Sequence, residues 1–363
     1  MAQIFVAAVN LGDFPPQFAK IATLYPVKRA TFPKISSKIL GTQKLILVDF
    51  LNMDLEKLAC LKACTKEIKA HPSIGLIDTK SRQQVLQARE LGFFNLVDRE
   101  DPFEALLAEI RGLLGNYSKP QLPKRIPEKV AKSVESACAS LDMMSAAALS
   151  GEPLPVKQLA GNAKGITATI AEEGLDNWLN AVQCHHSHTY CHTMMVTGHA
   201  VSFARALGLP ETEQFLLGLG ALVHDLGKVK IPLSILDKPG KLTPEERELV
   251  NKHPEFSREI LSSRKEVPKQ VVEMALWHHE FLDGTGYPEG LSGDRISPRV
   301  RMITITDIYS ALTEKRAYKD SLSSRQAFAI MFDMKGKLDI GLLRKFRSMV
   351  QGSEFGRVRR RAV

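Results

Sequence analysis

No stretch of this 363-residue sequence approaches the roughly 18 consecutive apolar residues that a membrane-spanning helix needs. The five cysteines are an odd number in a long chain, which excludes a disulfide framework. Glycine and proline are too few for a collagen-like or low-complexity chain. The opening residues, MAQIFVAAVNLGDF, have no basic region and reach Asp13 before a long apolar run, so no export signal is expected. These absences predict a reduced, cytoplasmic protein without membrane insertion.

The formal net charge of +9 would by itself suggest an anionic partner. Residues 352–363 hold four Arg and one Glu, and so contribute +3 of this excess. The remaining basic residues are scattered and are not interleaved with aromatic residues, so a nucleic-acid polymer is not the expected partner. We expect residues 351–363 to form a disordered tail, whose GSEF run is typical of a cloning remnant.

Residues 1–117 alternate short apolar runs with helical segments, which predicts an α/β domain. Buried parallel strands are expected at Ile4–Val9, Leu45–Phe50, Ile74–Asp78 and Phe93–Asp98. The domain is expected to end in a helix, because six apolar residues from Phe103 to Leu114 recur at helical spacing.

Asp49 and Asp78 stand at the ends of predicted strands, where open α/β sheets bind ligands. This arrangement resembles the receiver domain of response regulators, with Asp49 at the position of the phosphoacceptor. The receiver's acidic pair is reduced to Asp13, and Asp98-Arg99 stands where that family has Lys-Pro. Without the acidic cluster Mg²⁺ binding is not expected. We therefore favour a degenerate, non-phosphorylated receiver over a working one.

Residues 118–127 carry three prolines and are expected to be a linker, and residues 128–350 read as an all-α bundle. Val130, Val134 and Leu141 begin its helical periodicity. Helices are expected at 128–148, 154–173, 175–207, 211–226, 244–262, 267–281, 297–315 and 323–333. The helix expected at 128–148 would suit pairing with its copy in an oligomer as well as packing within one chain.

Nine of the ten histidines lie between His185 and His279, a window of 95 residues. Histidine is the commonest metal ligand, and groups of His with Asp or Glu suit divalent ions. Each fragment alone has a purely structural explanation, such as a surface pair, a helix end or a turn. Their joint occurrence on several helices of one bundle favours a metal site in its core.

The candidate ligands come in short fragments. His188 and His192, in HHSHTYCH, are four residues apart on a predicted helix and point the same way. The adjacent pair His224 and Asp225 ends an apolar helix, and Lys228 follows one turn later, where it could neutralise a phosphate. The other candidates are His253 in KHPE, His278 and His279 in WHHEFLDGTGYP, and Asp307 in ITITDIY.

Two of these fragments, ALVHDLGKVKIP and HHEFLDGTGYPEGL, resemble the signatures of the HD-GYP family, the bacterial cyclic-di-GMP phosphodiesterases of the HD superfamily. The resemblance covers about residues 175–350. It implies metal ligands at His192, His224, Asp225, His253, His278, His279 and Asp307. It implies substrate-binding roles for Lys228, Asp283, Gly284, Gly286, Tyr287, Pro288, Arg316 and Tyr318.

The mechanism that the resemblance implies is hydrolysis of cyclic-di-GMP to pGpG, with further hydrolysis to GMP left open. Two divalent ions, iron or manganese, would activate water and clamp the phosphate. Asp225 would bridge the ions, and Lys228 would stabilise the transition state, so both are predicted to be catalytic. The backbone N–H groups of residues 284–288 are expected to face the dinucleotide. Diguanylate cyclases with a GGDEF domain are a further partner that the resemblance suggests.

Three positions depart from the family pattern. His188 stands where some members have Glu; we keep it as a ligand, but it brings no charge to support a third metal ion. Phe281 and Lys230 replace residues that are usually polar and small, respectively. Two alternatives therefore stay open: a module that binds cyclic-di-GMP or a protein partner with little turnover, and a hydrolase of another cyclic dinucleotide.

Overall fold

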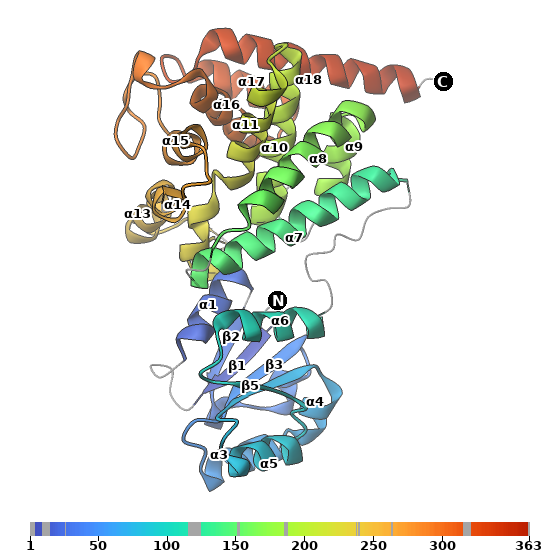
Figure 1. Cartoon of the computed structure of the whole chain (residues 1–363), viewed down its shortest axis with the longest axis vertical. Helices are drawn as coiled ribbons and strands as arrows, with labels where there is room; N and C mark the ends of the chain where they lie inside the picture. Colours follow the sequence, from blue (N-terminus) through green and yellow to red (C-terminus); the bar gives the residue numbers. More distant parts are fainter. Residues whose placement is uncertain are drawn as a thin grey trace. The chain divides into compact units, whose positions relative to one another are not determined.

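The computed structural model describes residues 4–8, 15–25, 27–114, 125–150, 153–184, 188–236, 238, 240–262, 264–314 and 321–361 (Figure 1). The chain divides into two compact units. The first comprises residues 1–117 together with 149–152 and 231–238, and the second comprises 118–148, 153–230 and 239–363. The two units are described separately below.

The first unit is built on a five-stranded parallel sheet (Figure 1). Its strands are β1 (Ile4–Ala8), β2 (Val27–Thr31), β3 (Leu45–Asp49), β4 (Ser73–Ile77) and β5 (Asn95–Asp98). They lie in the order β2-β1-β3-β4-β5, one of the two common orders of doubly wound α/β folds. The α/β prediction for this part of the chain is confirmed.

Four of the strands were predicted because they are runs of apolar residues, and every residue of β1, β3 and β4 is buried. Strand β2 is missing from the prediction. It lies at the edge of the sheet, and Lys28 and Arg29 at its centre are exposed. An edge strand needs no continuous apolar run, so the signal used for the other strands is absent here.

The helices of this unit are α1 (Pro16–Leu24), α2 (Ser37–Leu40), α3 (Leu55–Lys62), α4 (Thr65–Ala70), α5 (Arg82–Leu91) and α6 (Phe103–Leu114), with a 3₁₀ turn, η1 (Phe32–Lys34). Helix α6 is the one that the sequence predicts, and it buries Phe103, Leu106, Leu107 and Ile110. Between sheet and helices, the rings of Phe50 and Phe93 meet edge to face, with centroids 5.3 Å apart. One face of the sheet therefore packs with the adjoining helices into a hydrophobic core within this unit.

The second unit is helical, as predicted. Its longer helices are α7 (Glu128–Ser150), α8 (Val156–Glu173), α9 (Leu175–Val182), α10 (His188–Ala206), α11 (Glu211–Val223), α13 (Pro244–Asn251), α14 (His253–Ser262), α15 (Lys269–Trp277), α16 (Pro298–Thr313), α17 (Ser324–Asp333) and α18 (Ile340–Arg361). Its short turns are η2 (Leu226–Lys230) and η3 (Gly293–Arg295), whereas the short helix α12 (Leu233–Leu236) belongs to the first unit.

The helix boundaries differ from the prediction in three places. The segment 175–207 is two helices, α9 and α10, and the segment 244–262 is α13 and α14, separated at Lys252. Helix α18 was not predicted, and it continues to Arg361, so the expectation of a disordered tail over 351–363 is wrong for most of that segment. Residues beyond 350 have no hydrophobic period, so apolar spacing could not reveal this helix.

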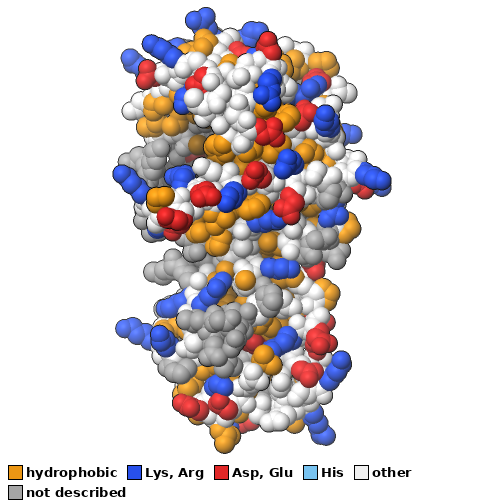
Figure 2. Space-filling view, turned by 90° about the vertical axis from the view of Figure 1, so that its left-hand side faces the viewer, with side chains coloured by type: hydrophobic (Ala, Val, Ile, Leu, Met, Phe, Trp, Pro, Cys, Tyr) orange, Lys and Arg blue, Asp and Glu red, His pale blue; other side chains and the backbone are white. Residues whose placement is uncertain are grey.

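On the face shown in Figure 2, Lys and Arg side chains are interspersed with Asp and Glu rather than gathered into one basic surface. Within the part of the chain that the structure describes, no helix is both long and apolar enough to cross a membrane.

Substituting Phe93 tests the core of the first unit. Phe93→Ala should lower the free energy of unfolding of this unit by about 3–5 kcal/mol, because it removes a buried aromatic ring. The neighbouring Phe94 is 65% exposed, so Phe94→Ala is the matched control. Urea unfolding followed by far-UV circular dichroism measures the change, since both tryptophans lie in the second unit. Equal transitions for the two variants would contradict this core.

Candidate metal centre

Asp225 lies where the predicted ligands converge. It follows His224, the residue that caps the C-terminus of α11, and its side chain is buried. Its Oδ2 lies 3.3 Å from Nε2 of His224 and 3.9 Å from Nε2 of His192. Its Oδ1 lies 3.2 Å from Nε2 of His253 and 3.9 Å from Nε2 of His278. Each oxygen of this carboxylate therefore faces a different pair of imidazoles.

Three of these imidazoles are oriented by the same local hydrogen bond to the backbone. Nδ1 of His224, His253 and His278 lies 2.7, 2.7 and 3.0 Å from the carbonyl oxygen three residues earlier in the chain. Each of these carbonyls belongs to the last turn of a helix (α11, α13 or α15), where the backbone has acceptors to spare. A carbonyl only accepts, so each Nδ1 carries the proton and each Nε2 presents a lone pair to the site.

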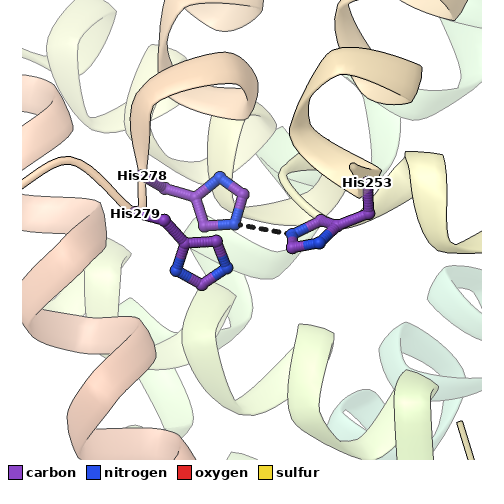
Figure 3. A group of neighbouring side chains, drawn as sticks. All are labelled: His253, His278 and His279. Carbon is purple, nitrogen blue, oxygen red and sulfur yellow. Dashed lines mark hydrogen bonds between the residues drawn. The ribbon is translucent and has the colours of Figure 1, made fainter. Parts of the chain in front are cut away.

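Nε2 of His253 and Nε2 of His278 are only 3.2 Å apart (Figure 3). With both Nδ1 atoms donating to carbonyls, neither Nε2 of a neutral ring has a proton to offer the other. The ring of His279 lies beside them, with its centroid 4.1 Å from that of His278. Converging lone pairs of this kind are stabilised by a cation placed between them.

Helix α16 closes the site from the opposite side. Asp307 Oδ1 lies 2.9 Å from Nε2 of His192 on α10, and both side chains are buried. One turn earlier, Thr304 Oγ1 donates to the carbonyl oxygen of His278 at 2.8 Å, which fixes α16 against the end of α15. Residues more than 100 positions apart are thus brought to one point.

A close backbone approach places His253 beside Asp225. Gly227 N donates to Oγ of Ser257 at 2.8 Å, and this hydroxyl donates to the carbonyl oxygen of His224 at 3.2 Å. A Cβ on Gly227 would overlap the backbone of His253 and Ser257. Glycine is therefore required here because η2 and α14 touch through their backbones.

Burial and neighbouring charges shift the pKa values of the side chains in the site. Burial lowers the pKa of His279 to about 3 and that of His278 well below its ordinary value. Burial raises the pKa of the Asp307 carboxyl, but the hydrogen bond with His192 and the charges of the neighbouring imidazoles together outweigh this and hold that pKa below its usual range. His224 shifts the other way: burial lowers its pKa, and the Asp225 carboxylate more than offsets this.

The donor set suits divalent transition ions. Three overlapping groups have ligand atoms within 4.8 Å of one another: His253, His278 and His279; His192, His224 and Asp307; His224, Asp225 and His278. Among the described residues, His224 Nε2 and Asp225 Oδ1 are buried without a hydrogen-bond partner. Buried imidazole and carboxylate atoms without a hydrogen-bond partner are groups that a metal ion would satisfy.

The two lysines of GKVK have different environments. Nζ of Lys228 lies 2.5 Å from Asp225 Oδ2, and its side chain is 23% exposed, so it reaches both the site and solvent. Nζ of Lys230 lies 2.7 Å from a carboxylate oxygen of Glu259 and 5.3 Å from the ring centroid of Phe256. The unusual Lys230 therefore has a structural role on α14 and is engaged away from Asp225.

The turn that contains GYP packs directly on His279, one of the predicted ligands. The ring of Tyr287 stacks on that of His279, with centroids 4.8 Å apart. A Cβ on Gly286 would overlap the backbone of residues 279–281. The buried Glu280 pins the turn, since its carboxylate accepts from the backbone N–H groups of Glu289 at 2.7 Å and Leu291 at 3.0 Å.

The expectation that backbone N–H groups of the Gly284–Pro288 turn face a dinucleotide is wrong for three of its residues. The N–H groups of Gly284, Thr285 and Tyr287 donate to Phe281 O, Asp283 Oδ1 and His279 O, at 2.9, 2.9 and 3.2 Å. Asp283 is exposed and closes its own turn, and Gly284 has a left-handed φ of 78°. The turn needs these bonds for its own shape. The unusual Phe281 packs on the core, with Lys337 Nζ 5.0 Å from its ring centroid.

Some of the sequence-predicted residues are not assembled here. Arg316 and Tyr318 lie outside the described residues, and for His188 only its backbone, at the start of α10, is described. His199 belongs to the histidine-rich window but not to the site: it is buried, and its Nδ1 lies 2.9 Å from Ser310 Oγ.

Sequence reasoning missed one buried carboxylate beside the ligands. Oε2 of Glu314 lies 3.7 Å from Nδ1 of His192, and Glu314 is only 2% exposed. The signal that could have found it is its spacing: Glu314 follows Asp307 by seven residues, which places both on one face of a helix.

Comparison with known families and proteins identifies the segment that contains the site. Residues 178–342 match the family model described as HD domain. A domain of this kind implies binding of a divalent metal ion. The solved structure of Bd1817, an HDG"Y"P protein from Bdellovibrio bacteriovorus, is similar with a TM-score of 0.51 at 19% identity, over 68% of this chain and 81% of that one, which is a likeness of fold.

Curated relatives match a little under half of the chain. The cyclic di-GMP phosphodiesterase PA4108 of Pseudomonas aeruginosa is 40% identical over 159 residues, 44% of this chain and 38% of that protein. The 3'3'-cGAMP-specific phosphodiesterase 2 of Vibrio cholerae is 39% identical over 168 residues, 46% of this chain and 32% of that protein. The chain thus spans only about a third of the length of the curated relatives that it matches.

Enlarging Gly227 tests how the site is assembled. Gly227→Ala should weaken Mn²⁺ binding at least tenfold, roughly 1–3 kcal/mol, because the new Cβ forces η2 away from α14 and so His253 away from Asp225. Gly165→Ala on α8 is the matched control, since a Cβ there meets no atom within 4 Å. Calorimetric Mn²⁺ titration measures the affinity. Unchanged affinity in Gly227→Ala would show that this contact does not position the ligands.

Proposed function

We propose that the chain is a metal-dependent phosphodiesterase of the HD-GYP family that hydrolyses cyclic-di-GMP. The match of residues 178–342 to the HD-domain family model, and the similarity to a protein named as a cyclic di-GMP phosphodiesterase, support this proposal. The product is the linear dinucleotide pGpG, and GMP follows if a second bond is cleaved. The observation that carries this proposal is the convergence of four imidazoles on the buried Asp225 carboxylate, with Lys228 at its open side.

The proposed centre holds two divalent ions, iron or manganese, and its ligands are His192, His224, Asp225, His253, His278, His279 and Asp307. His188 stays a predicted ligand that brings no charge to support a third ion. Such ions, when bound, supply positive charge for phosphate oxygens and lower the pKa of water. Asp225 is suited to bridge the pair, since Oδ1 faces His253 and His278 while Oδ2 faces His192 and His224.

Lys228 is the proposed phosphate-binding and catalytic cation. Its ammonium group contacts the Asp225 carboxylate and is partly exposed, so a phosphodiester that approaches the site meets it at the solvent boundary. There it can donate to a non-bridging oxygen and stabilise the charge that develops during cleavage. Tyr287, stacked on His279, and Pro288 would border the bound dinucleotide, and the Asp283–Gly286 turn would hold them in place. Arg316 and Tyr318 keep their proposed contacts with substrate.

A hydrolase of another cyclic dinucleotide is the second candidate, because one of the similar proteins is named as specific for 3'3'-cGAMP. A module that binds without turnover is less well supported. Two of the departures that suggested it, Phe281 and Lys230, are engaged in packing and ion-pair contacts and leave the proposed ligands in place. A cytoplasmic location, oligomerisation and binding to diguanylate cyclases stay predictions.

Removing Asp225, His224 or Lys228 tests the proposed activity. Asp225→Ala and His224→Ala should abolish hydrolysis of cyclic-di-GMP by the Mn²⁺- or Fe²⁺-loaded protein, because each removes a ligand. Lys228→Ala should retain the metal but lower kcat by roughly 10²–10³-fold. Anaerobic assays that separate pGpG from GMP measure the loss, and 3'3'-cGAMP as a parallel substrate distinguishes the second candidate.

Lys230→Ala is the matched control for Lys228→Ala, because it also removes one lysine of GKVK and should change kcat by less than about twofold. Activity that survives both Asp225→Ala and His224→Ala would sink the mechanism. Tight binding of cyclic-di-GMP by the metal-loaded wild type without turnover would instead favour the binding module.

For the first unit we propose a receiver-like domain that works without phosphorylation. The strand order, and a buried Asp49 at the carboxyl end of β3, support the likeness. The guanidinium group of Arg99, just after β5, forms an ion pair with Asp49 Oδ1, and the backbone N–H of Leu51 donates to the same oxygen at 3.1 Å. A carboxylate that is already neutralised in this way is a poor acceptor for a phosphoryl group.

Arg99 provides the test of this second proposal. Treatment of the wild type with acetyl phosphate should add no phosphoryl group, as measured by intact mass, and should leave phosphodiesterase activity unchanged. Arg99→Ala should destabilise the unit by about 3–5 kcal/mol, because it leaves Asp49 buried without its cation. The exposed Arg89 on α5 gives the control, Arg89→Ala. A phosphoryl adduct that disappears in Asp49→Asn would refute the proposal.

A further inference from the structure

His192 is held differently from three of the other predicted ligands. His224, His253 and His278 each use a backbone carbonyl to fix Nδ1. His192 lies within α10, where the carbonyls one turn back are engaged by the helix itself. Its Nδ1 makes no hydrogen bond among the described residues, and the carboxylate of Glu314 faces it at 3.7 Å.

The imidazole of His192 thus lies between two carboxylates of one segment. Nε2 lies 2.9 Å from Oδ1 of Asp307, and Nδ1 lies 3.7 Å from Oε2 of Glu314, the residue that caps the C-terminus of α16. The backbone N–H of Glu314 donates to the carbonyl oxygen of Ser310 at 2.8 Å, so the helix end holds its backbone in place. Both carboxylates are buried.

The single proton of a neutral His192 therefore has two possible acceptors. On Nε2 it bonds to Asp307 and blocks the lone pair that a metal ion needs. On Nδ1 it faces Glu314 and leaves Nε2 free to act as a ligand. Ligation by His192 requires the second tautomer, and a carboxylate beside Nδ1 stabilises that tautomer and strengthens the imidazole as a donor.

We propose that Glu314 is a positioning residue for the metal centre: it holds the proton of His192 on Nδ1 and so directs Nε2 to the metal. Its buried carboxylate lies on the side of the imidazole opposite to the atom that would bind the metal. This inference rests on the proposed function, because it requires that the site binds metal.

Mn²⁺ affinity of Glu314 variants tests the proposal without an activity assay. Glu314→Gln keeps the size of the side chain but removes its charge, and should weaken Mn²⁺ binding roughly 10–100-fold. Glu314→Asp keeps the charge and should lose less. Glu248→Gln on α13 is the control, since Glu248 is exposed and pairs only with Lys252 among the described residues. Circular dichroism establishes that each variant folds.

The tautomer of His192 provides a readout in the unmodified protein. ¹⁵N NMR of the Zn²⁺-loaded wild type should show the proton of His192 on Nδ1, and Glu314→Gln should shift that resonance. A deprotonated Nδ1 in the loaded wild type, or equal Mn²⁺ affinity of wild type and Glu314→Gln, would overturn the inference. Wild type that binds no Mn²⁺ at all would instead refute the proposed function.

Discussion

The buried charge of Asp225 is the constraint on which the helical unit depends. A carboxylate removed from water is stable only where cations or hydrogen-bond donors surround it. Here they come from separate parts of the chain: Lys228 from the next turn, His192 from α10, and His253 and His278 from the segments that follow α13 and α15. Any packing of these helices that left the carboxylate alone would be strongly unfavourable.

The sequence predicts the composition of this site well because its ligands follow local rules. Adjacent pairs such as His224 with Asp225 stand at helix ends, where apolar periodicity stops. The pair and the end of the periodicity can both be recognised in the amino-acid sequence. Glu314 was missed because its relation to His192 exists only once α10 and α16 pack. His199 shows that the density of histidines alone does not identify ligands. It lies in the same window but contacts Ser310 instead of the predicted ligands.

The same distinction explains what was predicted of the fold. The burial of a strand such as β3 is evident from its continuous apolar run, and that of one face of α6 from the helical spacing of its apolar residues. The edge strand β2 has no such pattern, because its central residues Lys28 and Arg29 are exposed, and the residues of α18 beyond 350 have no hydrophobic period. The ion pair of Asp49 with Arg99 also joins distant strand ends, and its residues were noted only as departures from a pattern.

The way His224, His253 and His278 are held has a consequence for how such a site can vary. Their rings take direction from the points at which α11, α13 and α15 stop, through a carbonyl three residues back. Point substitutions along the outer faces of these helices leave that geometry untouched. A one-residue insertion or deletion in a last turn would rotate a ring by about 100° and discard a donor. We therefore expect related sequences to keep the number of residues at these junctions more strictly than the identity of residues elsewhere on the helices.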